Sequence, residues 1–415
     1  MTVDADRLRA DIEANGEFGA IESAGYGRTV LAGSDANRRA RDRLCDRLDD
    51  AGLTVRVDAV GNVLGVWRPP SAADEAAPVV AGSHLDSVPQ GGIFDGPLGV
   101  YGALEAVRSL QESDVEPDRP IGVVSFTEEE GARFGGGMLG SAVATGQLDP
   151  AEALALDDGD GVSLADALED IGYRGEGVLD ASEWAAFLEL HVEQDTRLES
   201  AGVPVGVVTT VTGIAQATAR IAGQANHAGA TPMDERRDAL AAASEFVLAV
   251  EAAGRREAET GGNTAVATVG RLDVRPNVTN VVPGGVELGV DVRDVDRASM
   301  ERIFTALEDS LESIEAERPV RTALDRTLDV DPAPMADRCR SALESGADAA
   351  GVETMAMHSG AAHDAMRVSR VTDAGMLFAP SRDGISHNPR EWTDWEDCAT
   401  AARVLTEALA ELAQK

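Results

Sequence analysis

The stretch from Val79 to Val88 constrains the fold more than any other part of the chain. A short apolar run ends there in His84-Leu85-Asp86 and leads into a glycine-rich loop, as buried strands of α/β folds do where they deliver side chains to a site. On an extended chain His84 and Asp86 project to the same side. The Asp86 carboxylate can therefore hold one ring nitrogen of His84 and leave the other for a metal. Asp95 follows in a loop whose glycines let the backbone fold back toward His84. On this segment alone, a hydrogen-bonded strand-end histidine and a turn aspartate remain an equal alternative.

Three further segments place histidines or acids after apolar runs or in turn-rich loops. The run Ile121–Phe126 ends in three glutamates, 128–130, and the run from Trp184 ends at His191. His387 lies in a loop bounded by glycine and proline. Three adjacent acids usually form a solvated loop, but an apolar strand aims them at the same sheet edge as His84 and Asp95. The glycines of 135–140 lack the strand–turn–helix setting and the lysine of a phosphate-binding loop, so we exclude a nucleotide site.

The donor types in these segments favour a pair of metal ions. His84, Asp95, Glu130, His191 and His387 supply imidazole and carboxylate without thiolate, which suits zinc, with manganese or cobalt as alternatives. Five ligands exceed the three of a single catalytic zinc, and they suit two metals that share one carboxylate. Of two adjacent glutamates, one can bind metal while its neighbour remains free to move protons.

Charge excludes several kinds of partner. The 415 residues carry a formal net charge of −37, and Lys415 is the only lysine. Such a surface repels nucleic acid and anionic membranes, so we expect neither as a partner. The compact state is strained by self-repulsion that salt screens. We therefore expect that the protein comes from a salt-rich cytoplasm. The alternative is an acidic protein from a mesophilic source.

Other sequence features point to a soluble, cytoplasmic protein. No apolar run approaches the about 20 residues of a membrane helix, and the N-terminus lacks the basic start and apolar core of a signal peptide. Cys45, Cys339 and Cys398 are scattered, which argues against a disulfide framework and a thiolate metal site.

Length and patterning predict two domains. The pattern changes near Gly213, where alternating strands and two long helices begin, the first over 238–251 and the second over 298–317. We expect a catalytic domain over 1–212 and 328–415, with a smaller α+β domain inserted over 213–327.

Seven motifs occur in the order found in one enzyme family, the hydantoinase/carbamoylase amidases of the zinc aminoacylase and carboxypeptidase superfamily, and the chain resembles that family over nearly its whole length. The motifs are Gly82-Ser83-His84-Leu85-Asp86-Ser87-Val88, Phe94-Asp95-Gly96, Glu129-Glu130-Gly131-Ala132-Arg133-Phe134, His191-Val192-Glu193-Gln194, Asn226-His227-Ala228-Gly229-Ala230-Thr231-Pro232-Met233, Pro276-Asn277-Val278-Thr279-Asn280-Val281-Val282-Pro283-Gly284 and Ser386-His387-Asn388-Pro389. The family includes N-carbamoyl-L-amino-acid hydrolases, allantoate amidohydrolases and β-ureidopropionases.

The resemblance implies a specific metal centre. Asp95 would bridge two metals. His84 and His191 would complete one site, and Glu130 and His387 the other. It also implies a larger mixed-sheet α/β domain of zinc-aminopeptidase type, with an inserted lid that forms a homodimer.

The resemblance further implies catalytic and substrate-binding roles. Glu129 would be the general acid/base, Asp86 would support His84, and His227 would stabilise the tetrahedral intermediate. Asn280 and Arg293 would hold the substrate carboxylate, and Gln194 and Gly360 would line the pocket.

The guanidinium of Arg293 suits bidentate carboxylate binding independently of the family, although Val292-Arg293-Asp294 by itself also fits a surface ion pair. Two departures from the family stand out, Asp195 where glycine is usual and Ile93 where lysine is frequent. His363 with Asp364 is interpreted as supporting the site, and His358 as structural.

We therefore predict a dinuclear-metal amidohydrolase that cleaves the carbamoyl or ureido C–N bond of a small carboxylate. An aminoacylase or dipeptidase on the same scaffold is the nearest alternative, and a non-catalytic ligand-binding relative is another. The sequence does not discriminate among allantoate, N-carbamoyl-α-amino acids and N-carbamoyl-β-amino acids.

Overall fold

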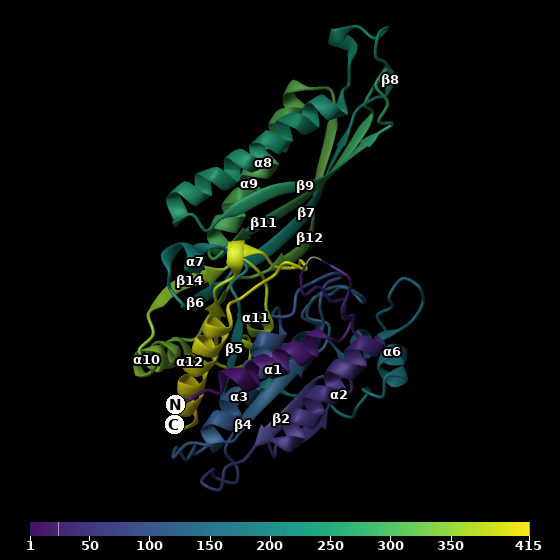
Figure 1. Cartoon of the computed structure of the whole chain (residues 1–415). Coiled ribbons are helices and arrows are strands. Elements are labelled where there is room, and N and C mark those ends of the chain that lie inside the picture. The colour runs from purple at the N-terminus through teal and green to yellow at the C-terminus, as the bar shows by residue number, and fades with distance from the viewer. Residues whose placement is uncertain (24, 415) are drawn as a thin grey trace. The chain divides into compact units, whose positions relative to one another are not determined.

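The computed structural model describes residues 1–23 and 25–414, and the chain forms two compact units (Figure 1). The larger unit comprises Met1–Thr209 together with the chain from Met335 onward, and the smaller unit is Thr210–Pro334. Each unit has its own hydrophobic core. The chain therefore leaves the larger unit once and returns to it, as expected for an inserted domain.

A nine-stranded mixed sheet forms the centre of the larger unit within the described residues. Its strands run in the order β1-β2-β4-β3-β5-β15-β6-β13, with β14 pairing to β6. Their bounds are β1 Thr54–Val57, β2 Val63–Trp67, β3 Val79–His84, β4 Ile121–Phe126, β5 Ala186–Val192, β6 Val205–Val211, β13 Ala333–Pro334, β14 Thr354–Ser359 and β15 Ala374–Ala379.

Four neighbouring strands, β4, β3, β5 and β15, are parallel. Every residue of these strands is buried, which matches their nearly continuous apolar sequences. Because their carboxyl ends share one edge of the sheet, the polar residues that end or follow them meet there. The polar strand-end residues were expected from the sequence to lie at this edge.

Helices cover this sheet. Helix α3 packs against β3 and β5, α12 packs against α3 and α10, and α10 packs against β15. The helices and 3-10 turns of this unit are α1 Ala5–Gly16, α2 Asp35–Asp50, α3 Pro97–Gln111, α4 Leu139–Ala144, α5 Pro150–Leu154, α6 Leu164–Asp170, η1 Ala181–Glu183, α7 Arg197–Ala201, α10 Asp337–Ala350, α11 Asp364–Val368, η3 Arg382–Gly384 and α12 Trp395–Ala413.

The smaller unit is a four-stranded antiparallel sheet with two helices on one face (Figure 1). The strand order is β12-β7-β11-β9, and a separate pair, β8 and β10, lies apart from it. The elements are β7 Gly213–Ala222, β8 Asn226–His227, η2 Met233–Glu235, α8 Ala239–Gly261, β9 Val266–Arg275, β10 Val281–Val282, β11 Gly285–Asp294, α9 Arg297–Glu317 and β12 Arg321–Val330. Alternation along β11 buries every second residue under α8 and α9.

Two features of the smaller unit differ from the sequence expectation. Strand β12 was not predicted, and the boundary expected at residue 328 falls inside it. Helix α8 continues ten residues beyond 251 and ends before Gly262, which has a φ of 84°. In this added part, Gly254 lets the helix approach Ala267 of β9 closely, since a Cβ there would lie 2.9 Å from the Ala267 Cβ. The fold class is as predicted, a larger α/β domain with an inserted α+β domain.

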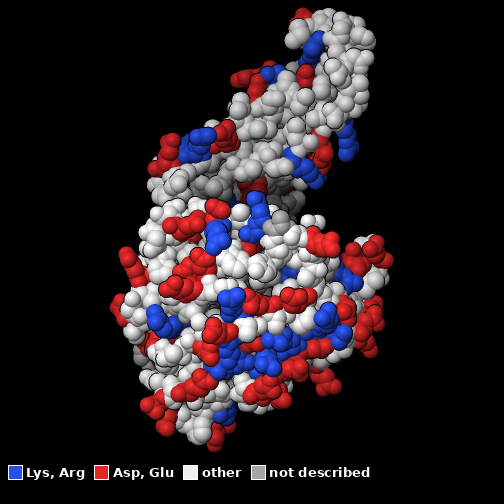
Figure 2. All heavy atoms as spheres, viewed as in Figure 1, with Lys and Arg blue, Asp and Glu red and all other residues white. Residues whose placement is uncertain are grey.

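The surface shown in Figure 2 carries many acidic side chains interspersed with arginines. Cys45, Cys339 and Cys398 are free. Among the described residues, no helix has the length and apolar character needed to cross a membrane.

Candidate metal centre

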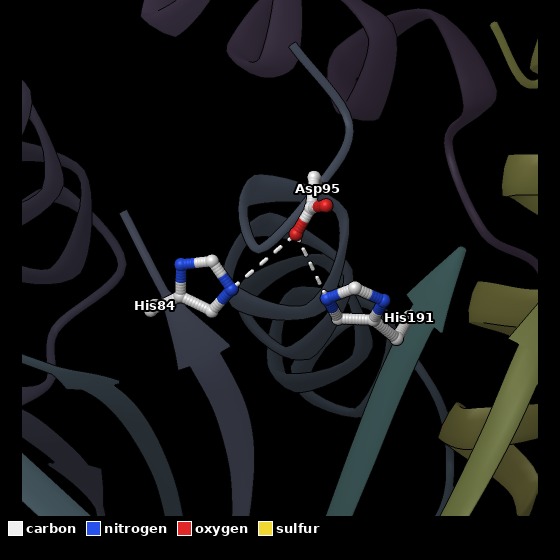
Figure 3. A group of neighbouring side chains, drawn as sticks. All are labelled: His84, Asp95 and His191. Carbon is white, nitrogen blue, oxygen red and sulfur yellow. Dashed lines mark ion pairs between the residues drawn. The ribbon is translucent and has the colours of Figure 1, made fainter. Parts of the chain in front are cut away.

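Asp95 lies between two histidines at the carboxyl edge of the large sheet (Figure 3). Its Oδ1 is 3.5 Å from His84 Nε2 and 3.2 Å from His191 Nε2. All three side chains are nearly fully buried. One ligand atom from each lies within 4.8 Å of the other two, so the three side chains can hold one metal ion.

The other carboxylate oxygen of Asp95 faces a second group. His387 Nε2 lies 3.4 Å from Asp95 Oδ2 and 3.3 Å from Glu130 Oε2. These three residues form another set that could hold a metal ion. The structure thus brings the five predicted ligands together, with Asp95 common to both sets.

The two sets differ in exposure. The side chains of His84 and His191 are 1% and 2% exposed, whereas that of His387 is 51% exposed. His84 and His191 are in strands, but His387 is in a loop and has a positive φ of 54°. The second set is therefore held by loops rather than by the sheet.

Local sequence explains how Asp95 reaches this position. Gly96 has a φ of 81°, and a Cβ there would lie 2.6 Å from the His84 ring. Only glycine permits this close approach. Pro97 then starts α3 with a φ that already suits a helix.

The ring orientations suit metal binding. Nδ1 of His84 lies 3.1 Å from the backbone oxygen of Asp86, and Nδ1 of His191 lies 3.0 Å from that of Val192. A carbonyl bonded to Nδ1 fixes the proton there and leaves Nε2 as an electron-pair donor. Both Nε2 atoms point to Asp95 (Figure 3).

Asp86 differs in detail from its predicted contact. Its carboxylate is 3.8 Å from His84 Nδ1, and its backbone carbonyl makes the hydrogen bond instead. The reason is that β3 ends at His84, so that Asp86 is no longer on the extended strand. The carboxylate accepts hydrogen bonds from the backbone N–H groups of Glu129 at 3.4 Å and Glu130 at 3.2 Å. Asp86 therefore orients the glutamate loop.

Glu129 lies beside the first set, with Oε2 3.7 Å from His84 Nε2. Burial raises its pKa well above the ordinary value, even though the charge of His84 opposes this. Burial and the charge of Asp95 raise the pKa of Glu130 to about 7. Burial also acts on Asp95, but the positive charge of His191, followed by hydrogen bonds from His191, His387 and His84 in their doubly protonated forms, holds its pKa well below the ordinary value.

The donor set fits two divalent cations. Three imidazoles and two carboxylates converge here, and these are donor types that bind divalent cations. Cations here would favour the ionised form of the buried glutamates and the neutral form of the histidines. A third set, Glu189, His191 and His363, shares His191. It is already hydrogen-bonded, because Glu189 accepts from Ser83 and Ala365 and His363 contacts Ser359.

Three further residues that the sequence analysis singled out lie in the larger unit: Gln194, Gly360 and Asp364. Gln194 has a φ of 60°, and its amide donates to Asp95 Oδ2 at 2.9 Å. Gly360 follows β14, in the loop that leads to His363. Asp364 is fully buried and accepts a hydrogen bond from Ser141.

The departure at Asp195 adds no unpaired acid. Its carboxylate pairs with Arg197 at 2.8 Å. Arg197 also donates to the backbone oxygen of His358 at 2.8 Å, two residues before Gly360. Asp195 therefore takes part in a surface ion pair.

The smaller unit carries His227, Asn280 and Arg293. His227 is exposed on β8, opposite Val281 of β10. The backbone oxygen of Asn280 accepts from Ala228 at 2.9 Å, which holds the two predicted residues in neighbouring segments. Arg293 is on β11 and pairs with Asp291 at 2.9 Å.

Two backbone hydrogen bonds determine which nitrogen of the neutral His227 ring carries the proton. Its Nδ1 accepts hydrogen bonds from the backbone N–H groups of Gly229 and Ala230, each at 3.0 Å. The proton is therefore on Nε2, which can donate to a ligand.

Sequence reasoning missed Glu391. It is buried, and it contacts the loops of both Asp95 and His387. Only its place four residues after a predicted ligand could have suggested this contact. Ser386 and Glu189 were likewise not singled out.

Comparisons with known proteins show the family of the chain. Residues 80–411 match the model of peptidase family M20/M25/M40. The chain is 40% identical to N-carbamoyl-L-amino acid amidohydrolase of Geobacillus stearothermophilus over 99% of both chains. It is 35% identical to allantoate amidohydrolase of Bacillus subtilis, over 97% of this chain and 96% of that one.

A solved structure shows the same architecture. The hydantoinase/carbamoylase family amidase of Burkholderia multivorans has a TM-score of 0.92 and 37% identity, covering 100% of this chain and 99% of that one. The chain therefore belongs to peptidase family M20/M25/M40, within its hydantoinase/carbamoylase branch, and is a metal-dependent hydrolase of carbon–nitrogen bonds.

Proposed function

We propose that the protein hydrolyses the carbamoyl or ureido C–N bond of a small carboxylate, such as an N-carbamoyl amino acid or allantoate. One observation carries this proposal: four potential ligands converge around a fifth, Asp95, and Glu129 lies beside them outside both sets. The names of the relatives point to the same bond type. Hydrolysis releases the carbamoyl group as ammonia and carbon dioxide and leaves an amine, which in the case of allantoate still carries its second ureido group.

Two divalent cations are the expected cofactors. His84, His191 and Asp95 would hold one, and Asp95, Glu130 and His387 the other. Imidazole and carboxylate ligands favour zinc, with manganese or cobalt as alternatives. When bound, such ions polarise the scissile carbonyl and lower the pKa of water.

Glu129 is the proposed general acid/base. Its carboxylate is close to the first set of ligands and is kept in place by the bond from its backbone N–H to Asp86. It would take the proton from the attacking water and pass it to the leaving nitrogen.

The residues of the smaller unit would bind the substrate. His227 Nε2 carries a hydrogen that can stabilise the oxyanion of the tetrahedral intermediate. Arg293 and Asn280 would hold the substrate carboxylate, because a guanidinium makes bidentate bonds to it. Gln194 and Gly360 would line the pocket in the larger unit.

We also propose that the smaller unit acts as a lid and joins two chains. Strand β9 is at an edge of its sheet, and exposed apolar side chains lie on it and on α8: Leu248, Val266 and Leu272. An apolar sheet edge favours pairing with a second copy. We expect a homodimer, which sedimentation in high salt would detect.

The central experiment is a substrate panel. Metal-free protein is loaded with zinc, manganese or cobalt, and ammonia release is measured in high salt with N-carbamoyl-α-amino acids, N-carbamoyl-β-amino acids and allantoate. An N-acetyl amino acid and a dipeptide test the aminoacylase or dipeptidase alternative, which would be favoured if only these were hydrolysed.

Glu129→Gln tests the mechanism. We expect a loss of about 10²–10⁴-fold in kcat, the usual contribution of general acid–base catalysis, with two ions still bound. Turnover equal to the wild type would contradict the assigned role.

A further inference from the structure

Glu391 lies under the loop that delivers Asp95. Glu391 is 1% exposed. Oε1 accepts hydrogen bonds from the backbone N–H groups of Phe94 at 2.9 Å and Asp95 at 3.0 Å. A carboxylate with two backbone donors on one oxygen fixes the path of that backbone.

The other oxygen of Glu391 reaches the loop that delivers His387. Ser386 Oγ is 2.9 Å from Glu391 Oε2 and 2.8 Å from Asp95 Oδ2. Ser386 directly precedes His387 in the chain. Glu391 and Ser386 therefore connect the backbone at Asp95, the carboxylate of Asp95 and the residue next to His387.

The surroundings leave Glu391 little freedom to move. A Cβ at Gly92 would lie 2.3 Å from Oε1 and 2.5 Å from the Cβ of Glu391, so the loop packs directly on this side chain. Arg28 also holds this loop, donating from its backbone N–H to the backbone oxygen of Gly91 at 3.0 Å and from Nε to that of Gly92 at 2.9 Å.

The second set of ligands depends on such support more than the first. His84 and His191 are fixed by paired strands, whereas His387 is in an irregular loop and is half exposed. Hence the distance from His387 to Asp95 depends on what joins their two loops.

We propose that Glu391, acting through Ser386, is a positioning residue that sets the affinity for the second divalent cation, the one shared by Asp95, Glu130 and His387. The inference rests on the proposed metal centre. It assigns to Glu391 no contact with the ion or with the substrate.

Zinc titration of the metal-free variant Glu391→Ala, with a competing chelator, tests this inference. We expect the second zinc to bind about 10–100-fold more weakly, the range for residues that orient metal ligands, while the first keeps its affinity. Ser386→Ala should give the same selective effect with a smaller magnitude. Glu105→Ala is the matched control, because it removes a buried carboxylate that pairs with Arg7 away from the centre. It should lower the melting temperature and leave both zinc affinities unchanged.

Gly92→Ala provides a second variant that keeps the carboxylate. The added methyl group would displace Glu391, and we expect the same selective weakening even if Glu391→Ala does not fold. If the folded variants bound both zinc ions with unchanged affinity, or bound both equally more weakly, this inference would be overturned and the proposed function would stand. A wild-type protein that binds fewer than two zinc ions would overturn the proposed function, and this inference with it.

Discussion

The predicted site residues of the two units are held in opposite ways. In the larger unit, His84, His191 and Asp95 are almost completely buried, and each histidine ring lies between Asp95 and a backbone oxygen. In the smaller unit, His227 and Asn280 are exposed on short segments. The site residues of the larger unit are therefore positioned before any ligand binds, whereas those of the smaller unit are exposed and available to contact a substrate.

This difference separates two kinds of contribution to the reaction. A buried set of ligands can bind ions without reorganising, which makes it useful for charge stabilisation. Exposed donors contribute when a substrate or a closing motion removes water from around them. We therefore expect changes in the larger unit to affect metal content, and changes in the smaller unit to affect turnover or substrate binding alone.

His191→Ala should have the largest effect. It removes the Nε2 that lies 3.2 Å from Asp95, so we expect one ion fewer per chain and turnover at background. Metal analysis after desalting and an ammonia-release assay measure this. His358→Ala removes a histidine outside the centre, and it should retain two ions. Two tightly bound ions in the His191 variant would contradict the expectation that the larger unit determines the metal content.

His227→Ala should lower kcat by about 10²–10³-fold, the cost of removing one oxyanion donor. Because the residue is in the other unit, both ions should remain bound. Steady-state kinetics and metal analysis of the same sample give both quantities. Loss of metal together with activity would show that the smaller unit also affects metal binding, contrary to the proposal.

Arg293→Lys should act mainly on substrate binding. Lysine keeps the charge but loses the bidentate geometry, so we expect KM for the carboxylate substrate to rise about tenfold, with a smaller change in kcat. Arg220→Lys is a matched control, since Arg220 is on the neighbouring strand β7 and pairs with Glu287. An equal change in KM in both variants would indicate a general effect of surface charge.

The same contrast explains what could be predicted from the sequence. Three of the predicted ligands of the larger unit end or follow apolar strands, and the parallel sheet brings these strand ends together. Periodicity was therefore enough to expect His84, Glu130 and His191 at one edge. The residues of the smaller unit have no such signal. His227 and Arg293 were singled out chiefly through family resemblance, and the roles assigned to them remain predictions.

Strand β12 and Glu391 were missed for physical reasons. Most of β12 is exposed, and its sequence Arg321–Val330 contains four charged residues, so it lacks a buried apolar face that would predict a strand. Glu391 is buried through contacts with backbone groups that are distant in the chain, such as the N–H of Asp95. No local pattern records contacts of that kind.

Charge also differs between the units and leads to the smallest predicted effect. Residues 210–334 contain 21 acidic and 13 basic side chains, whereas the rest of the chain contains 52 and 23. The larger unit therefore has the higher density of negative charge, about 0.10 per residue against about 0.06. Self-repulsion should strain it more at low ionic strength.

Raising KCl from 0.1 M to 2 M shortens the screening length from about 10 Å to below about 3 Å. We expect the melting temperature to rise by about 5 °C, which for domains of this size corresponds to roughly 1–3 kcal/mol. Hydrogen exchange followed by mass spectrometry can assign the gain, which should be greater in β3, β4 and β5 than in β7 and β11. Sucrose at equal osmolality is the control, because it strengthens burial without screening charge. If sucrose stabilised the protein as much as KCl, or if the two units gained protection equally, charge density would not distinguish them.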